Sequence, residues 1–311
     1  MDRERHGLPR SAASRVLLFA TISSLVVVAV ASALITSVFS SAAPPLVGSA
    51  HSAAPSAAGK PLTIAVARTA GGPSEWRAYA RAIQRMSEAT GRPMRVRYAM
   101  TRAEVVGLVE SSEVDAGFLC TNCYLELADQ PGVSLVAAPR IAGESMDAAV
   151  LVVRASSSYT SLGDLGGHRV GVIEPDSLGG HTYLYWLAKQ ENIDVSRSMV
   201  VVCGDSQEQN IKALLAGELE ATVVNRSQLA LWDCESLTII SSSPEFGMPP
   251  FVAGSTVDTA TRAAMKQALL GIDPSSGEKG SLVQGFRDVA EADYGFAREL
   301  SRFSTELRAS E

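Results

Sequence analysis

Residues 151–177 read LVVRASSSYTSLGDLGGHRVGVIEPDS. Two apolar runs in and around this stretch predict strands at 148–153 and 169–173. A helix is predicted at 180–190, after the turn that contains Pro175. The spacing of apolar residues changes here from that of a strand to that of a helix within a few residues. Such a change is typical of an α/β protein.

The same alternation continues on both sides of this stretch. Further strands are predicted from apolar or alternating runs at 62–67, 94–98, 115–119, 134–138, 199–203, 221–224 and 237–240. Helices are predicted from helical spacing and end signals at 74–90, 102–109, 123–128, 207–216, 227–232, 259–270 and 282–289. Strands that alternate with helices indicate open sheets covered by helices on both faces.

A short pattern occurs twice, 105 residues apart. Glu113–Leu119 reads EVDAGFL and Glu218–Val224 reads ELEATVV, so in each copy an acidic pair precedes an apolar strand. The separation is too long for a solenoid repeat. Two similar α/β lobes would explain it, although so short a match also arises by chance. Two facing lobes would leave a cleft at the carboxyl ends of their parallel strands.

Composition excludes several classes of protein. The 311 residues are 46% hydrophobic and 19% charged, which is too apolar for a disordered chain. The net charge of -6 argues against nucleic acid as a partner, because such binders need a basic face. Four cysteines in this length do not form a disulfide scaffold. The sequence also lacks the Gly-x-Ser-x-Gly, phosphate-loop and His-Glu-x-x-His motifs of common enzymes.

The N-terminal segment predicts export. Residues 1–15 carry four arginines against two acids, and Val16–Phe39 contains no charged residue. A run of this length can cross a bilayer, and the basic flank would leave the later residues outside the cytoplasm. A cleaved signal peptide is the alternative, because Ala31-Ser32-Ala33 is a small-residue cleavage site. Residues 40–60 are rich in Ala, Ser and Pro, which indicates a linker.

The stretch from Thr63 to about Leu270 resembles the phosphonate-binding family of periplasmic substrate-binding proteins of ABC transporters. The matching pieces are LTIAVA, VESSEVDAGFL, the 151–177 stretch and ALLAGELEATVVN, and the most specific piece is the Ser161–Gly167 run SLGDLGG. The resemblance implies a two-lobe type II binding-protein fold in which each lobe is an open mixed sheet. It also implies chain crossings near Ala137–Arg140 and Ser243–Phe251.

The resemblance implies a function without catalysis. Such a protein captures a small oxyanion such as phosphonate, phosphate or phosphite between its lobes and presents it to an ABC permease, with no cofactor. The expected organisation is a cytoplasmic arm at 1–15, a membrane anchor or uncleaved signal at 16–39, a linker at 40–60, lobe 1 at 61–139, lobe 2 at 140–245, and a return to lobe 1 at 246–311. A sensing subunit of a membrane signalling system is an alternative that the sequence leaves open.

The expected ligand contacts follow strands at their carboxyl ends. Ser177, Gly179, Gly180 and His181 open a helix, where free N–H groups attract anions and glycines admit a ligand to the backbone. Arg68 and Thr69 follow the first strand, and Cys120, Thr121 and Asn122 follow a later one. By resemblance, Tyr124 would be a tyrosine of the cleft, and Asn225 would stand where many members have an acid that pairs with a ligand amine. Leu178 and Gly179 replace two hydroxyl donors of the family's run.

The Cys120-Thr121-Asn122-Cys123 motif allows three interpretations. Outside the cytoplasm, a local disulfide between Cys120 and Cys123 is favoured. A thiol–disulfide oxidoreductase using this pair is the alternative from another functional class. A soft-metal site with Cys203 and His181 is less favoured, because no second CxxC or pair of histidines supports it.

Overall fold

The computed structural model describes residues 59–67, 73–230, 232, 234–273 and 282–309, which belong to one compact unit over 57–311. Within them, no helix combines the length and the apolar character needed to cross a bilayer. The expected anchor at Val16–Phe39 lies outside the described residues.

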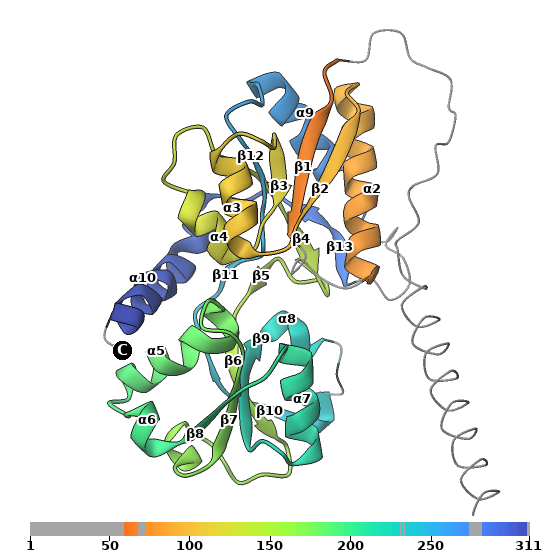
Figure 1. Cartoon of the computed structure of the whole chain (residues 1–311). Helices are drawn as coiled ribbons and strands as arrows, with labels where there is room; N and C mark the ends of the chain where they lie inside the picture. The colour runs from red at the N-terminus through yellow and green to blue at the C-terminus, as the bar shows by residue number, and fades with distance from the viewer. Residues whose placement is uncertain (1–58, 68–72, 231, 233, 274–281, 310–311) are drawn as a thin grey trace, which may run out of the picture. The chain divides into compact units, whose positions relative to one another are not determined.

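Lobe 1 contains a six-stranded mixed sheet in the order β13–β4–β12–β3–β1–β2 (Figure 1). Its strands are β1 (Leu62–Ala67), β2 (Met94–Ala99), β3 (Ala116–Phe118), β4 (Ser134–Ile141), β12 (Phe251–Ala253) and β13 (Val283–Arg287). The pairs of β1 with β2 and β3 are parallel, whereas β12 and β13 pair antiparallel to their neighbours. Strand β12 therefore lies between β3 and β4, although it follows both of them by more than 100 residues in the chain.

Helices cover both faces of this sheet because β1 is apolar on both. Leu62, Ile64 and Val66 pack against α2 (Pro73–Thr90) and α9 (Thr259–Leu270). Ala65, which points the other way, belongs to the cluster that includes α3 (Arg102–Glu110) and α4 (Thr121–Leu127). This two-sided burial is what an uninterrupted apolar run predicts for a parallel strand.

Lobe 2 contains a five-stranded mixed sheet in the order β10–β6–β9–β7–β8. Its strands are β6 (Ala149–Arg154), β7 (Arg169–Val172), β8 (Val200–Cys203), β9 (Ala221–Asn225) and β10 (Leu237–Ser242). Its helices are the π-helical turn η3 (Leu178–Thr182), α5 (Tyr183–Gln190), α6 (Val195–Ser198), α7 (Gln207–Ala216) and α8 (Arg226–Leu229). The short 3₁₀ turns η2 (Gly163–Leu165) and η4 (Cys234–Ser236) complete the lobe.

Two short strands link the lobes. Strand β5 (Met146–Asp147) carries the chain out of lobe 1, β11 (Phe246–Gly247) carries it back, and the two pair antiparallel. The expected crossing at Ala137–Arg140 is wrong, because these residues lie inside β4 and pair with β12 and β13. The return crossing falls within the expected Ser243–Phe251.

A third connection ends in the C-terminal helix. After β13, the chain passes through η6 (Glu291–Tyr294) into α10 (Gly295–Ala309), which contacts α4 in lobe 1 and α5 and η3 in lobe 2 (Figure 1). The helix predicted at 282–289 is wrong, since these residues form the edge strand β13. Gly285 has a φ of 87°, and the register shifts between Val283 and Phe286, which marks a bulge in β13. Because of the bulge, the apolar residues of this strand do not alternate regularly along the sequence.

The two copies of the repeated pattern have the same geometry. In lobe 1, Asp115 donates its N–H to the carbonyl of Thr63 at 2.8 Å and accepts from the N–H of Thr63 at 2.7 Å. In lobe 2, Glu220 makes the corresponding bonds with Arg169, at 3.0 and 2.9 Å. In both lobes the acid ties the start of a central strand to its parallel neighbour.

Candidate ligand-binding site

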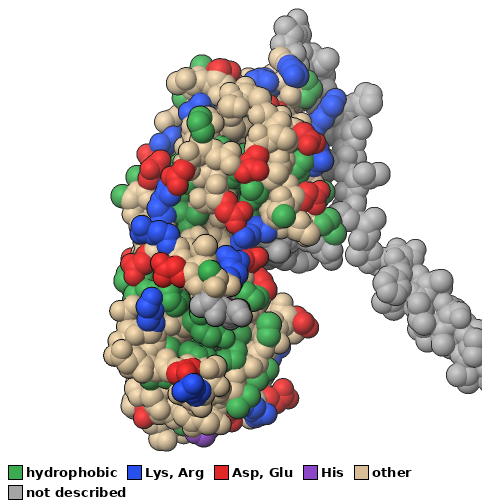
Figure 2. Space-filling model, turned by 60° about the vertical axis from the view of Figure 1, so that its left-hand side comes forward, with side chains coloured by type: hydrophobic (Ala, Val, Ile, Leu, Met, Phe, Trp, Pro, Cys, Tyr) green, Lys and Arg blue, Asp and Glu red, His purple; other side chains and the backbone are tan. Residues whose placement is uncertain are grey.

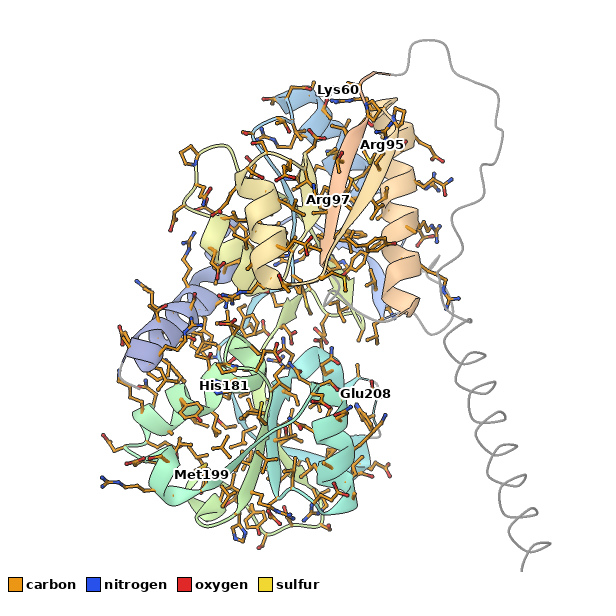
Figure 3. All side chains as sticks on the ribbon, in the orientation of Figure 1. Lys60, Arg95, Arg97, His181, Met199 and Glu208 are labelled. Atoms are coloured by element: carbon orange, nitrogen blue, oxygen red, sulfur yellow. A yellow bond between two sulfur atoms is a disulfide. The ribbon has the colours of Figure 1, made fainter. Side chains whose placement is uncertain are left out.

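The turn at the carboxyl end of β7 forms the lobe 2 side of the candidate site. Figure 3 shows His181, from this turn, and Glu208, from the start of α7, at the edge of lobe 2 that faces lobe 1, while Met199 lies at the opposite end. The strands of lobe 2 that run parallel, β7, β8 and β9, therefore end toward lobe 1, where a ligand between the lobes would meet them.

Ser177 organises the start of the helix. Its Oγ accepts from the N–H of Gly180 at 3.1 Å, and its carbonyl accepts from the N–H groups of His181 and Thr182. Within the described part of the chain, the N–H groups of Leu178 and Gly179 have no hydrogen-bond acceptor. Two backbone donors at a helix N-terminus are thus without a partner within the described residues.

Gly179 lies directly against Asn225. A Cβ on Gly179 would lie 2.1 Å from Oδ1 of Asn225, so only glycine fits there. The Asn225 side chain donates to Asp147 at 2.8 Å and accepts from Nε2 of Gln207 at 3.2 Å. The expected site residue Asn225 is thus part of a polar cluster with Asp147 and Gln207.

Gln207 and Asp147 were not predicted as site residues. Two signals could have identified them: Gln207 opens a helix just after the carboxyl end of β8, and Asp147 is a charge placed immediately before the apolar run AAVLVV. Charged residues are rarely buried without partners, so an acid beside a buried strand indicates a polar network.

The turn after β3 forms the lobe 1 side of the candidate site. Cys120 and Cys123 are joined by a disulfide, with their α-carbons 5.1 Å apart. Thr121 donates through Oγ1 to the carbonyl of Gly247 at 3.3 Å. The Asn122 amide donates to the carbonyl of Asp176 at 3.0 Å and accepts from Ser301 at 3.2 Å. Asn122 is therefore engaged in holding lobe 1 to lobe 2 and α10.

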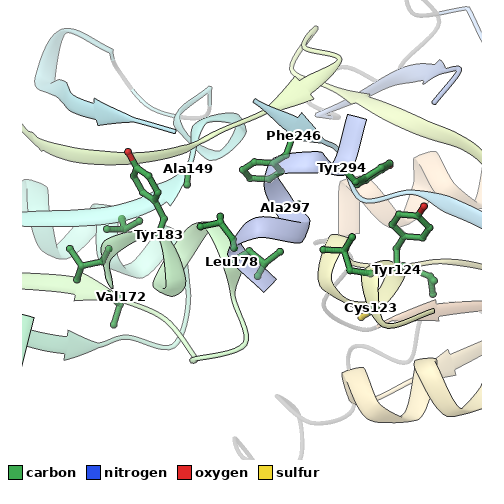
Figure 4. Packing of buried hydrophobic residues seen from close by; sticks show 14 of the residues in the cluster. Cys123, Tyr124, Ala149, Val172, Leu178, Tyr183, Phe246, Tyr294 and Ala297 are labelled. Carbon is green, nitrogen blue, oxygen red and sulfur yellow. The ribbon is translucent and has the colours of Figure 1, made fainter. Parts of the chain in front are cut away.

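One expected contact, Tyr124, lies in the interior of the protein. Figure 4 shows the apolar cluster that runs from Tyr183 through Leu178 and Ala297 to Tyr294 and Tyr124. Tyr124 is 2% exposed, and its ring centroid lies 4.7 Å from that of Tyr294. Burial raises the pKa of the Tyr124 hydroxyl. Tyr124 is thus covered by Tyr294, and its contact with a ligand stays a prediction.

Gly180 makes contacts within its own turn. Its N–H is already bonded to Ser177, and a Cβ there would lie 2.6 Å from Cγ1 of Ile173. The turn needs glycine at this position for internal packing, and a contact of Gly180 with a ligand stays a prediction. His181 stacks on Tyr185 with ring centroids 4.8 Å apart, and its contact with a ligand stays a prediction.

Charges at the lobe boundary are paired with one another. Asp176 accepts from Arg308 of α10 and lies 3.5 Å from Nη1 of Arg102, which also pairs with Glu126. On the face shown in Figure 2, basic and acidic side chains are intermixed. Such a surface lacks the single-sign field that nucleic acid binding requires.

The remaining predicted positions are Arg68, Thr69 and Cys203. Arg68 and Thr69 lie outside the described residues. Cys203 is exposed and free. Within the described ranges, no group of three or more His, Cys, Asp or Glu side chains could hold a metal ion.

The fold is similar to that of solved binding proteins. XAC2383 from Xanthomonas citri, solved with ATP, has a TM-score of 0.61 at 14% identity, over 80% of this chain and 98% of its own. A binding protein component of an ABC phosphonate transporter from Pseudomonas aeruginosa has a TM-score of 0.60 at 16% identity, over 81% and 88%. PhnD1 from Prochlorococcus marinus, solved with methylphosphonate, has a TM-score of 0.61 at 13% identity, over 78% and 97%. At these identities the likeness concerns the fold.

Sequence comparison identifies the family. No protein with a curated description matches significantly. A family model described as the periplasmic phosphonate substrate-binding protein of ABC transporters matches residues 72–294. Proteins of this family are transport components rather than enzymes, so the oxidoreductase alternative is not favoured. The match covers the elements from α2 to η6, and the chain belongs to the phosphonate-type periplasmic substrate-binding proteins of ABC transporters.

Proposed function

We propose that the protein captures a small oxyanion between its lobes and presents it to an ABC permease. Phosphonate, phosphate and phosphite are the ligands that the proposal covers. One solved relative of the same fold binds methylphosphonate, which supports this class of ligand. The proposed contacts are the turn at Ser177–His181 with Asn225 on lobe 2 and the Cys120–Asn122 turn with Arg68 and Thr69 on lobe 1.

The observation that carries the proposal is the pair of backbone donors at Leu178 and Gly179. They lie at the N-terminus of the continuous helix formed by η3 and α5, where the helix dipole adds partial positive charge. Backbone donors need no hydroxyl side chains, so they explain how Leu178 and Gly179 can replace the two hydroxyl residues of the family's run. Charge-assisted hydrogen bonds to an oxyanion contribute roughly 1.5–3 kcal/mol each.

We further propose that Val16–Phe39 anchors the protein in the membrane with the folded part outside the cytoplasm. The length of the apolar run and the four preceding arginines support this topology. Membrane fractionation followed by N-terminal sequencing tests it. A mature N-terminus near Ala33 in the soluble fraction would instead identify a cleaved signal.

Calorimetry on the full-length protein tests the ligand class. Methylphosphonate, phosphate, phosphite and methanesulfonate are titrated in turn, and thermal unfolding is followed with each, because a ligand of the native state raises Tm. We expect saturable binding of at least one phosphorus oxyanion and weaker binding of the singly charged sulfonate. Absence of binding to all four would contradict the proposed function.

A further inference from the structure

Asp147 is a buried carboxylate whose hydrogen bonds all come from lobe 2. It lies on the connecting strand β5 and is 2% exposed. Its Oδ1 accepts from the N–H groups of Ala148 at 2.9 Å and Ser227 at 3.1 Å. Its Oδ2 accepts from the Ser227 hydroxyl at 2.8 Å and from Nδ2 of Asn225 at 2.8 Å. Four donors thus occupy the two carboxylate oxygens.

These bonds fix the orientation of the Asn225 amide. A carboxylate only accepts hydrogen bonds, so the NH₂ group of Asn225 must face Asp147 and its Oδ1 must face away. Oδ1 accepts from Nε2 of Gln207 at 3.2 Å, and Oε1 of Gln207 accepts from the backbone N–H of Asn225 at 2.8 Å. A backbone N–H can only donate, so the N–H of Asn225 fixes the orientation of the Gln207 amide, as the Asp147 carboxylate fixes that of the Asn225 amide.

The network also decides what lobe 2 presents to a ligand. Asn225 and Gln207 are half-buried, whereas Asp147 lies buried behind them. Asn225 touches Gly179, beside the two free backbone donors of the helix start. A ligand at those donors therefore meets a neutral pair of amides, while the carboxylate behind them is already saturated.

We infer that Asp147 is a positioning residue that holds Asn225 and Gln207 as a neutral wall of the ligand site. Gln207 is then a ligand-site residue, and the wall selects oxyanions that carry no cationic substituent. An ammonium group brought against this wall would lose its hydration without reaching a carboxylate oxygen, because four donors already occupy those of Asp147. The inference rests on the proposed function, because it names the subclass of oxyanion that the same site takes.

Two probes that differ only in an ammonium group test the inference. Methylphosphonate and aminomethylphosphonate are titrated calorimetrically into the full-length protein at pH 7. We expect methylphosphonate to bind at least about tenfold more tightly. Affinities within about threefold of each other would overturn the inference and leave the proposed function intact. Failure of the protein to bind any phosphorus oxyanion would overturn the proposed function, and the inference with it.

Exchanging the acid and the amide tests the positioning role. In Asp147→Asn alone, the new NH₂ group faces the NH₂ group of Asn225. Turning Asn225 and then Gln207 only moves the conflict to the backbone N–H of Asn225, where two donors meet. In the double variant Asp147→Asn/Asn225→Asp, the NH₂ group at 147 again meets a carboxylate at 225, the Ser227 hydroxyl turns from donor to acceptor, and the negative charge moves to the half-buried position 225. The net charge of this variant is unchanged.

We expect Asp147→Asn to lower Tm by about 5 °C, from one buried unsatisfied donor. The double variant should recover most of this loss and reduce the preference for methylphosphonate below about threefold. Asp205→Asn is the control, because it makes the same charge change at an exposed carboxylate two residues before Gln207 in the chain. A folded double variant that keeps the wild-type preference would overturn the inference. If the double variant does not fold, the affinities of the wild-type protein for methylphosphonate and aminomethylphosphonate still test the inference.

Discussion

Gly179 and Asn225 are in contact across the two turns that end β7 and β9, with no space left for a β-carbon. A Cβ on Gly179 would lie 2.1 Å from Oδ1 of Asn225 and 2.9 Å from its Cγ. The contact joins the helix start, which holds the free backbone donors, to the amide network on Asp147. A displacement of either turn therefore changes both parts of the proposed site.

Gly179→Ala is expected to weaken oxyanion binding at least about tenfold, a loss of roughly 1.4 kcal/mol. The methyl group forces Asn225 away from Gln207 or moves the helix start, and each shift misplaces a ligand contact. Calorimetry with methylphosphonate measures the effect. Gly107→Ala is the matched control, because a Cβ there meets nothing within 4 Å in the middle of α3. Unchanged affinity in Gly179→Ala would place the ligand elsewhere.

The acids of the repeated pattern should contribute unequally to stability. Asp115→Ala leaves the half-buried N–H of Thr63 without its carboxylate acceptor and should cost about 1–2 kcal/mol of unfolding free energy. Glu220→Ala should cost less than about 1 kcal/mol, because Arg169 is exposed and water can replace the acceptor. Urea unfolding measures both, and Asp115→Asn, which keeps an acceptor oxygen, should recover part of the loss. Equal costs would contradict this explanation.

Asp164, in the SLGDLGG run, should make stability depend on pH. The backbone N–H of Thr160, the Thr160 hydroxyl and Ser161 donate to its carboxylate and lower the pKa of Asp164. A lowered pKa stabilises the fold fully above the unfolded value of about 3.9, and this contribution is lost as the pH falls through the lower folded value. Asp164→Asn should therefore lower Tm at pH 7 and differ progressively less from wild type below about pH 4. A difference that stays constant down to pH 2 would contradict the assignment.

Replacing the disulfide should leave ligand binding intact, because the contacts proposed for the Cys120–Asn122 turn are made by its backbone N–H groups. Cys120 caps α4 by accepting from the N–H of Cys123 at 3.0 Å, and serine is a preferred residue at such a position. We expect Cys120→Ser/Cys123→Ser to fold and to bind methylphosphonate within about threefold of wild type. A thiol-exchange assay on the wild-type protein should show no catalysis. Loss of binding in a folded double variant would assign the sulfur atoms a direct role.

The alternation of strands and helices was sufficient to predict open sheets covered by helices, because strand and helix periodicity is a local property, whereas the two-lobe arrangement was implied by the family resemblance. The turn that begins at Ser177 was predicted from Pro, Ser and Gly residues, whose conformational preferences are local. The polar network of Asp147, Asn225 and Gln207 could not be predicted in the same way. Its members are 78 and 18 residues apart along the chain, and only the folded sheet brings them together.

The features that the sequence did not indicate share one physical cause, which is packing between segments that are distant in the chain. Leu178 and Tyr124 follow strands at the expected edge, yet residues from Tyr294 to Leu300, in η6 and α10, bury both. Nothing near Tyr124 in sequence indicates that Tyr294 will cover it. Strand β13 differs from the predicted helix for a related reason, since its pairing partner among the described residues, β4, ends 142 residues earlier at Ile141.

The position of β12 has a consequence for the order in which the molecule is completed. All strands of lobe 2 precede β12 in the chain, so a chain that emerges from its N-terminus can close that sheet first. The sheet of lobe 1 cannot close at that stage, because β12 is the strand that joins β3 to β4. Until Phe251–Ala253 is available to pair, β3 and β4 therefore each have an unpaired edge that can associate with other chains. The N-terminal half of lobe 1 thus comes first in the chain but gains its central strand β12 only after every strand of lobe 2, so we expect its unpaired edges to be the part of the folding chain most open to aggregation.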